Sequence, residues 1–496
     1  MTLNTSDVVG SVGVQPFGET IRKSAEVRMS DVTRYLAAAA HSDAKFRREV
    51  LKDIHYAPFR CKAPEFGVDA NLVTDQCLLA ERRRKFRDLL LFVALLAVLV
   101  PSGALTDFSY ILQDVDNISP YLNYHSMSLL LLVLIGATVL FGEKLMVEHF
   151  TLRKRFAKRS AMTAETSSGA PRQNLIVYSG YAPFVGSGLA LRDWSFAVDL
   201  RKAKEGNEGQ AEAVSAAGVL QAVRSRLGDL AIPNLEQYNV LFVDGRRVRE
   251  DKQLMSSPYD LPPSSISEQM ISDFGSGQED RRRSYFCAAV TDWSGELVMT
   301  SYLRSKKGKS HLFVELSHFI LPPLKSKYYG IDSTDPMLRI KWVLQRILGA
   351  IITSPFFLIF SPFSVFASVT APIQRWFASR RARKTIAQNP AFNFGATTSV
   401  RQLGSENRFR IYFQQLDRDM HLKTLEICII DAIVSYLDEL GIDTSDIRER
   451  RTAILNTGVM ITGGTVKAES LVAGAGAKSV ISRVQSGLSG GGEQAK

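Results

Sequence analysis

The sequence predicts an α+β membrane protein with a two-helix transmembrane hairpin, a cytoplasmic antiparallel α+β domain and a C-terminal helical and β module. Three observations lead to this fold class. No lysine or arginine lies between Arg87 and Lys144, and two apolar blocks fill this window. After residue 173, short apolar runs bounded by turn residues surround one helical stretch, as in α+β domains. Near the C-terminus, apolar residues recur at three- and four-residue steps, which indicates a helix.

The N-terminal region is expected to be a disordered tail over residues 1–28, which lack apolar periodicity, followed by cytoplasmic helices over 29–85. Ser30 and Ser42 can cap two short helices in this region. Asp69 or Asn71 can cap a long helix that passes through a basic cluster directly into the membrane.

The hairpin is expected over residues 86–148, with spans at about 88–106 and 122–142. Its connector carries only acidic charges, and basic residues flank both outer ends. This asymmetry places both termini in the cytoplasm, so we expect a multi-pass protein of the cell membrane, such as a bacterial inner membrane. The basic residues predicted to contact anionic lipid headgroups are Arg82, Arg83, Arg84, Lys85, Arg87, Arg153, Lys154 and Arg155.

Composition narrows the classes of partner. The chain carries 61 basic and 50 acidic residues, a net charge of +11, and much of the excess borders apolar segments. This placement favours a bilayer with anionic headgroups over nucleic acid, for which no recognition module is visible. The four cysteines are scattered without metal-like spacing, so free cytoplasmic thiols are expected, with no metal and no cofactor.

A linker is expected over residues 161–172, followed by the cytoplasmic domain over 173–335. One helix is predicted over 211–230. Strands are predicted at 174–179, 194–200, 237–243, 284–290, 296–303 and 311–316. Runs of strands interrupted by a single helix favour an antiparallel sheet over a doubly wound fold.

Residues 340–376 form a third apolar segment, which contains Pro355, Pro362 and Pro372 and has basic flanks on both sides. A single crossing would leave one basic flank outside. We therefore expect a re-entrant or in-plane segment broken at Pro355 and Pro362. A buried helical hairpin on the soluble domain and a full crossing remain open alternatives.

The C-terminal module is expected over residues 405–466, as a helix over 408–440 and a later segment of β character. The apolar stripe of this helix is wide, which favours packing on its own domain; homo-oligomerisation through it is the second interpretation. A glycine- and serine-rich tail over 486–496 is expected to be disordered.

The candidate ligand site is the glycine-rich loop Gly186-Ser187-Gly188, where backbone amides could approach a phosphate or carboxylate. The loop lacks the lysine and the following helix of a P-loop, so a tight connection between strands is the favoured alternative. No catalytic residue is predicted, because no nucleophile elbow, zinc motif or His/Cys cluster occurs.

Three stretches resemble a group of actinobacterial membrane proteins with no known activity: Asp193-Trp-Ser-Phe-Ala197, Leu321-Pro-Pro-Leu324 and Ile454-Leu-Asn-Thr-Gly-Val-Met-Ile-Thr-Gly-Gly464. The resemblance implies an architecture and no chemistry. The leading hypothesis is a membrane-anchored binding, scaffold or sensing protein with an unidentified protein partner. The alternatives are a transporter or pore subunit that uses the hairpin and residues 347–374, and a hydrolase or nucleotide-binding enzyme in residues 173–335.

Overall fold

The computed structural model describes residues 31–102, 125–148, 152, 156, 173–202, 212–276, 282–332 and 340–456. The chain divides into two units, Met1–Ile447 and Arg448–Lys496, and the architecture below is that of the first. The predicted tails over 1–28 and 486–496 and the linker over 161–172 lie outside the described residues.

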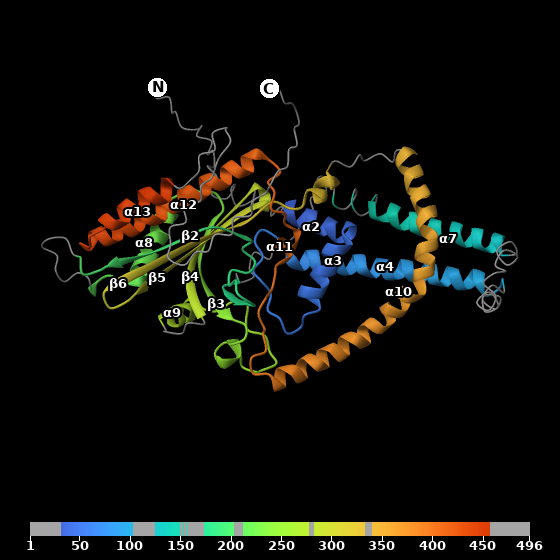
Figure 1. Ribbon diagram of the computed structural model, residues 1–496, viewed down its shortest axis with the longest axis horizontal. Coiled ribbons are helices and arrows are strands. Elements are labelled where there is room, and N and C mark those ends of the chain that lie inside the picture. The colour runs from blue at the N-terminus through green and yellow to red at the C-terminus, as the bar shows by residue number, and fades with distance from the viewer. Residues whose placement is uncertain are drawn as a thin grey trace, which may run out of the picture. The chain divides into compact units, whose positions relative to one another are not determined.

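A six-stranded sheet with the order β1-β3-β4-β5-β6-β2 organises the domain that the sequence predicts over residues 173–335 (Figure 1). Its strands are β1 Leu175–Tyr178, β2 Leu189–Asp199, β3 Leu235–Asp244, β4 Arg282–Asp292, β5 Leu297–Lys307 and β6 His311–Leu321. All neighbours pair antiparallel except β1 and β3, which are parallel. The α+β class is thus confirmed, while the expectation of a purely antiparallel sheet is wrong at the β1 edge. A long crossover joins β1 to β3, and such a connection permits parallel pairing.

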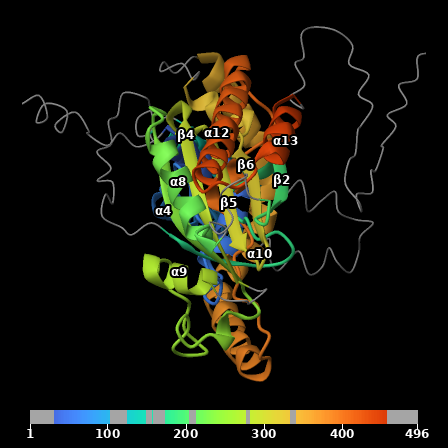
Figure 2. The same ribbon diagram turned by 90° about the vertical axis from the view of Figure 1, so that its left-hand side faces the viewer.

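One face of the sheet carries the helices α8 (Ala216–Gly228) and α12 (Tyr412–Glu439) (Figure 2). Ser215 caps α8 by accepting a hydrogen bond from the Gly218 amide. A side chain at Gly218 would overlap the Tyr436 hydroxyl, so the two helices pack closely here. The helix α12, which lies within the predicted range 408–440, packs against α8 and β5 and buries one of its faces there.

On the opposite face, the centroid of the Phe184 ring lies within 5.5 Å of the rings of Phe242, Tyr285, Tyr302 and Phe319. Ala63, Phe66 and Ala396 pack into the same cluster. The helix α9 (Glu268–Ser276) and the short η5 (Val248–Glu250) pack on the same face as α8, against Leu241 and Val243 of β3, and η6 (Trp293–Gly295) connects β4 to β5. Strand residues alternate between the two faces, as expected for a sheet buried on both sides.

The N-terminal helices are α2 (Asp31–Ser42), α3 (Ala44–Val50), the π-helix η1 (Leu51–His55) and the long α4 (Ala70–Leu99). Asp69 caps α4, as predicted; Asp43 rather than Ser42 caps α3, because its carboxylate accepts the amides of Lys45 and Phe46. Arg34 forms a two-pronged hydrogen bond with Asp332, which follows η7 (Ser326–Ile331). This contact ties the helices to the end of the sheet domain.

Among the described residues, two helices are long and apolar enough to cross a membrane: α7 (Ser126–Leu145), in a stretch that reaches Glu148, and α10 (Ile340–Gln388). The first predicted span coincides with the end of α4, which continues without a break from its basic cluster to Leu99. Large apolar side chains on α7 and α10 stay exposed, Met127 by 74% and Phe366 by 71%. The connector at 103–124 lies outside the described residues.

The helix α10 continues through all three of its prolines. The expected break at Pro355 and Pro362 is therefore wrong in form, because the structure has one bent helix instead of two pieces (Figure 1). Pro362 cannot donate to the Leu358 carbonyl, and the Ser361 hydroxyl donates to it instead, at 2.7 Å. This side-chain hydrogen bond lets the helix pass the proline.

The path of α10 can be followed through its contacts with α7 and α4. Near its start, the Trp342 indole donates to Glu148 at 2.9 Å, and further along the Ser354 hydroxyl donates to the Val133 carbonyl at 3.0 Å. The start of α10 therefore lies near the C-terminal end of α7, and Ser354 lies beside the middle of α7.

Beyond this point α10 returns. Ser364 hydrogen-bonds to Asp88 of α4, and the adjacent Arg87 donates to Glu143 at 2.9 Å, close to the end of α7 where α10 began. Trp342 near the start of α10 and Ser364 in its middle therefore both lie toward the end of α7 that carries Glu143. The middle of the bundle is a small apolar core that includes Leu91, Leu140 and Leu358.

Gly136 sets the distance between α7 and α10. A Cβ at this position would overlap the Ser354 hydroxyl and lie 2.9 Å from a Leu358 methyl carbon. We expect Gly136→Ala to lower stability by about 1–2 kcal/mol, measured by thermal unfolding in detergent, because Ser354 must give up its hydrogen bond. Gly142→Ala is the control, since nothing lies within 4 Å of it. Equal or opposite effects of the two changes would contradict this packing.

After α10, the short α11 (Val400–Gly404) leads to α12, and α13 (Ser445–Asn456) follows. The segment expected to have β character covers residues 453–466, and its first four residues, 453–456, are helical. Helix propagation from Ser445 extends through them, and the remainder of that segment, 457–466, lies outside the described residues.

Candidate functional site

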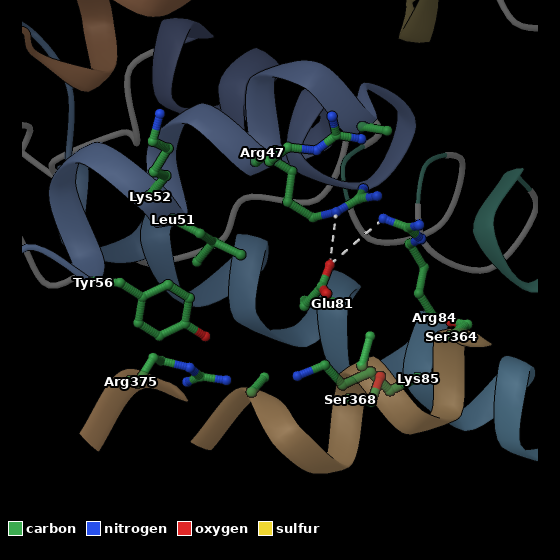
Figure 3. Close-up of a pocket in the computed structure, with 14 residues that line it drawn as sticks. Arg47, Leu51, Lys52, Tyr56, Glu81, Arg84, Lys85, Ser364, Ser368 and Arg375 are labelled. Carbon is green, nitrogen blue, oxygen red and sulfur yellow. Dashed lines mark ion pairs between the residues drawn. The ribbon is translucent and has the colours of Figure 1, made fainter. Parts of the chain in front are cut away.

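A basic pocket lies where α3, η1, α4 and α10 meet, with a volume of about 510 Å³ (Figure 3). Two smaller cavities of about 420 and 340 Å³ border the sheet domain. A volume of several hundred cubic ångströms is typical of small-molecule sites. The pocket is lined by six cations, Arg47, Arg48, Lys52, Arg84, Lys85 and Arg375, and by a single acid, Glu81.

The acid is shared between two arginines. Arg47 and Arg84 each lie 3.6 Å from the same Glu81 oxygen, as the dashed lines in Figure 3 show. Arg47 is 3% exposed and donates to the Ala40 carbonyl at 2.8 Å. Burial, and next the neighbouring Arg84, lower the pKa of the Arg47 guanidinium. The positive charge in the pocket is therefore incompletely balanced by the protein.

The wall formed by α10 consists of small and polar residues. Its lining positions are Ser364, Ala367, Ser368, Ala371 and Arg375, which recur at helical spacing and share one face. The short side chains of Ser364, Ala367, Ser368 and Ala371 leave space that larger residues would fill. At the end of this wall, the Arg375 guanidinium lies over the Tyr56 ring, 4.3 Å from its centroid.

The other side of α10 is apolar and exposed next to the pocket: Phe363, Phe366 and Val369 are exposed by 66–71%. The same stretch of helix thus presents a polar face to the basic pocket and an apolar face away from it. Such a distribution is typical of helices at a membrane interface.

One turn beyond Lys85, α4 passes into the apolar bundle, and there the charges are paired. Arg87 hydrogen-bonds both Asp88 and Glu143, and its guanidinium lies 4.8 Å from the centroid of the Phe357 ring. Asp88 also accepts a hydrogen bond from Ser364. This satisfied network separates the incompletely balanced pocket from the apolar core.

The sequence identified only part of the pocket. Of the predicted basic residues, Arg84 and Lys85 line it, Arg87 belongs to the adjacent network, and Arg82 and Arg83 lie on other faces of α4. The predicted residues Arg153, Lys154 and Arg155 lie outside the described residues. The residues that sequence reasoning missed are Arg47, Arg48, Lys52 and Arg375. The helical spacing of Arg48 and Lys52 was the one local signal that could have found them.

The Gly186–Gly188 loop is packed against other segments of the chain. Gly186 and Gly188 have φ values of +89° and +92°, and a side chain at Gly186 would lie 2.6 Å from the Pro64 carbonyl oxygen. Ser187 is 1% exposed, and its hydroxyl lies 2.8 Å from the Tyr302 hydroxyl. The glycines thus permit a close approach of backbones, and ligand binding here stays a prediction.

A buried polar network lies between the sheet and α12. The Ser301 hydroxyl is 2.7 Å from His318 Nδ1, and His318 Nε2 is 3.7 Å from Glu426. The three groups have the composition of a hydrolase triad. However, Ser301 is 1% exposed, the other two are fully buried, and none of the three cavities above is lined by them. Burial, and next Arg192, lower the pKa of His318 to about 3, so its imidazole is a poor base.

The network depends on Arg192, which donates to Glu426 at 3.1 Å. We expect Arg192→Leu to lower stability by about 2–4 kcal/mol, because Glu426 then stays buried without a cation. Chemical denaturation in detergent measures the change, and the double variant Arg192→Leu/Glu426→Leu should recover part of it. A double variant less stable than the single one would contradict this account.

Within the described residues, no group of three or more histidine, cysteine, aspartate or glutamate side chains could hold a metal ion. All four cysteines are free thiols, as the sequence predicts. Burial raises the pKa of the Cys61 and Cys77 thiols to about 12, so neither is a reactive thiolate at neutral pH.

These observations define an α+β protein with a six-stranded sheet, candidate membrane helices and a cationic pocket at their junction. The chain belongs to the AbeC-like domain family, whose model matches residues 193–467, more than half of the 496 residues. No curated protein and no solved structure matches the chain. The matched range includes most of the sheet, α10 and α12, whereas α3, η1 and α4 precede it, so the pocket combines residues from both parts.

Proposed function

We propose that this chain is a membrane-anchored binding or sensing protein whose sheet domain faces the cytoplasm and which has no catalytic chemistry of its own. The observation that carries this proposal is the continuity of α4. The same helix lines the basic pocket through Arg84 and Lys85 and contributes Leu91 to the apolar bundle. A ligand in the pocket would therefore touch the helix that forms the anchor.

The proposed topology has a hairpin with spans at about 88–106 and 122–142, cytoplasmic termini and a re-entrant α10. Basic flanks around a connector with only acidic charges support the hairpin. The return of α10 to the end of α7 from which it started supports a re-entrant path over a crossing. The resemblance to actinobacterial membrane proteins favours the same arrangement, in a bacterial inner membrane.

The proposal includes self-association of the chain, which would give it a scaffold role. The first half of α12 exposes Tyr412, Phe413, Leu416 and Met420, while its second half is buried on the sheet. A second copy of the chain can cover these side chains. Sedimentation of the full chain in detergent should give a dimer that Phe413→Glu converts to a monomer; a wild-type monomer would remove this role.

The experiment that tests the absence of chemistry is an activity screen on the full chain in detergent, with ester, phosphoester and nucleotide substrates. We expect no turnover. Turnover that is lost on Ser187→Ala would overturn the binding proposal in favour of an enzyme in residues 173–335.

The second candidate is a transporter or pore subunit. The observation that favours it is the network of Arg87, Asp88 and Glu143, because ionisable groups between apolar helices often mark a transport pathway. This candidate requires solute flux into liposomes that Asp88→Asn abolishes. The anchor proposal predicts no flux in either protein.

A further inference from the structure

We propose that the basic pocket between α3, η1, α4 and α10 binds a phosphate-bearing anion, supplied by a phospholipid headgroup or by a soluble phosphate compound. The inference deepens the proposed function and rests on it in one respect, the position of the pocket at the membrane surface.

The first argument is charge. The lining holds six cations and one carboxylate, and no described carboxylate pairs with Arg48, Lys52 or Lys85. Like charges gathered in a concave site repel one another, and a bound anion removes that repulsion. Burial is the main cause of the lowered pKa of Arg47, and repulsion from Arg84 adds to it.

The second argument is the geometry of the donors. At 3.6 Å, the contacts of Glu81 with Arg47 and Arg84 are longer than charge-assisted hydrogen bonds, which measure about 2.7–2.9 Å. Among the described residues, no group accepts a hydrogen bond from the buried Arg47 Nε. Guanidinium groups present forked N–H donors that fit phosphate oxygens, and an oxygen between Arg47 and Arg84 could accept from both. In Figure 3 the charged ends of Lys85 and Arg375 point toward each other along the α10 wall.

The third argument is space and position. The wall of Ser364, Ala367, Ser368 and Ala371 leaves room for a tetrahedral anion, and the Ser368 hydroxyl can donate to it. The apolar side of α10 beside the pocket and the passage of α4 into the apolar bundle put the cations at headgroup depth in the proposed topology. A single concave site with one aromatic residue, Tyr56, does not fit the extended groove of nucleic-acid binders.

The test is calorimetric titration of the full chain in a non-ionic detergent with three probes: dioctanoyl phosphatidic acid, dioctanoyl phosphatidylcholine and inorganic phosphate. The pocket variant is Lys85→Gln/Arg375→Gln. The matched control, Arg381→Gln/Arg383→Gln, removes the same charge from exposed positions of α10 outside the lining. Ser368→Phe keeps every charge but fills the cavity.

We expect phosphatidic acid to bind the wild type at least tenfold more tightly than phosphatidylcholine, with an affinity that falls as salt is added. The pocket variant and Ser368→Phe should each weaken binding tenfold or more, and the control should leave it unchanged. Phosphatidic acid far tighter than inorganic phosphate assigns the lipid as the source, and equal affinity assigns a soluble phosphate compound. Both results support the phosphate site.

The inference would be overturned if neither phosphatidic acid nor inorganic phosphate binds. It would also be overturned if the pocket variant and the control lose the same amount of affinity. The folding of each variant is checked by its thermal transition without ligand. Alkaline carbonate extraction of membranes distinguishes the absence of a phosphate site from the absence of a membrane anchor. A chain that stays in the membrane but binds no phosphate loses only the site, whereas a chain that is extracted loses the anchor.

Discussion

Gly188→Ala should lower the free energy of unfolding by more than about 4 kcal/mol, the largest effect that we expect of any single added methyl group. Gly188 has a φ of +92°, and a Cβ there would overlap the Ile320 carbonyl oxygen and lie 2.8 Å from its carbon. Both obstacles are backbone atoms of β6, which are held in the sheet by pairing with β2 and β5. The loop must therefore leave the sheet, and chemical denaturation in detergent measures the loss.

Gly180→Ala is the matched control for this prediction. Gly180 has a φ of +93°, yet nothing lies within 4 Å of its added Cβ. Gly180→Ala should lower the free energy of unfolding by only about 1–2 kcal/mol, the cost of backbone strain for an L-residue in this region. Similar losses in the two variants would show that strain, and not the approach to β6, explains the glycines of this loop.

Arg401→Leu should lower stability by about 3–5 kcal/mol, the range measured when one partner of a buried charged contact is removed. Arg401 is fully buried and donates to the carbonyls of Glu296 at 2.9 Å and Pro322 at 2.8 Å. Burial lowers its pKa to about 10, so it remains protonated at neutral pH. Without it, these carbonyls lose their donor in a site that water does not reach.

The control for Arg401 is Arg408→Leu, because Arg408 is exposed a few residues later in the same connection. It should change stability by less than about 0.5 kcal/mol. The melting temperatures of the two variants give the comparison directly. A loss at Arg408 equal to that at Arg401 would mean that charge alone, and not the buried hydrogen bonds, stabilises the joint between α11 and the sheet.

Local patterns in the sequence predicted most of the elements. Short apolar runs bounded by turn residues located all six strands, and Asp69 marked the start of a helix that the structure retains. Local patterns did not predict the order of the strands in the sheet. The placement of β2 beside β6, and of β1 parallel to β3, depends on side chains far apart in the chain, which periodicity does not reveal.

The same reason explains why the pocket was found only in part. Lys85 stood out because it borders an apolar block, but Arg47 and Arg375 are separated by most of the sheet domain in sequence. The prediction drawn from the prolines of α10 was wrong for a different reason. Pro362 predicted a break, whereas the Ser361 hydroxyl satisfies the carbonyl that the proline leaves free. Such compensation depends on the neighbouring residue and not on the proline itself.

The most direct test of the central claim, a membrane anchor with the sheet domain on one side, is cysteine labelling of the full chain after replacement of the four native cysteines. Ser119→Cys marks the predicted connector, Ser256→Cys the sheet domain and Ala378→Cys the far part of α10. A membrane-impermeant maleimide is applied to sealed vesicles of each orientation. The account predicts that Ser256→Cys and Ala378→Cys react only from the cytoplasmic face and Ser119→Cys only from the other. Labelling of all three cysteines from one face would contradict the hairpin. Labelling of Ala378→Cys from the same face as Ser119→Cys would contradict the return of α10.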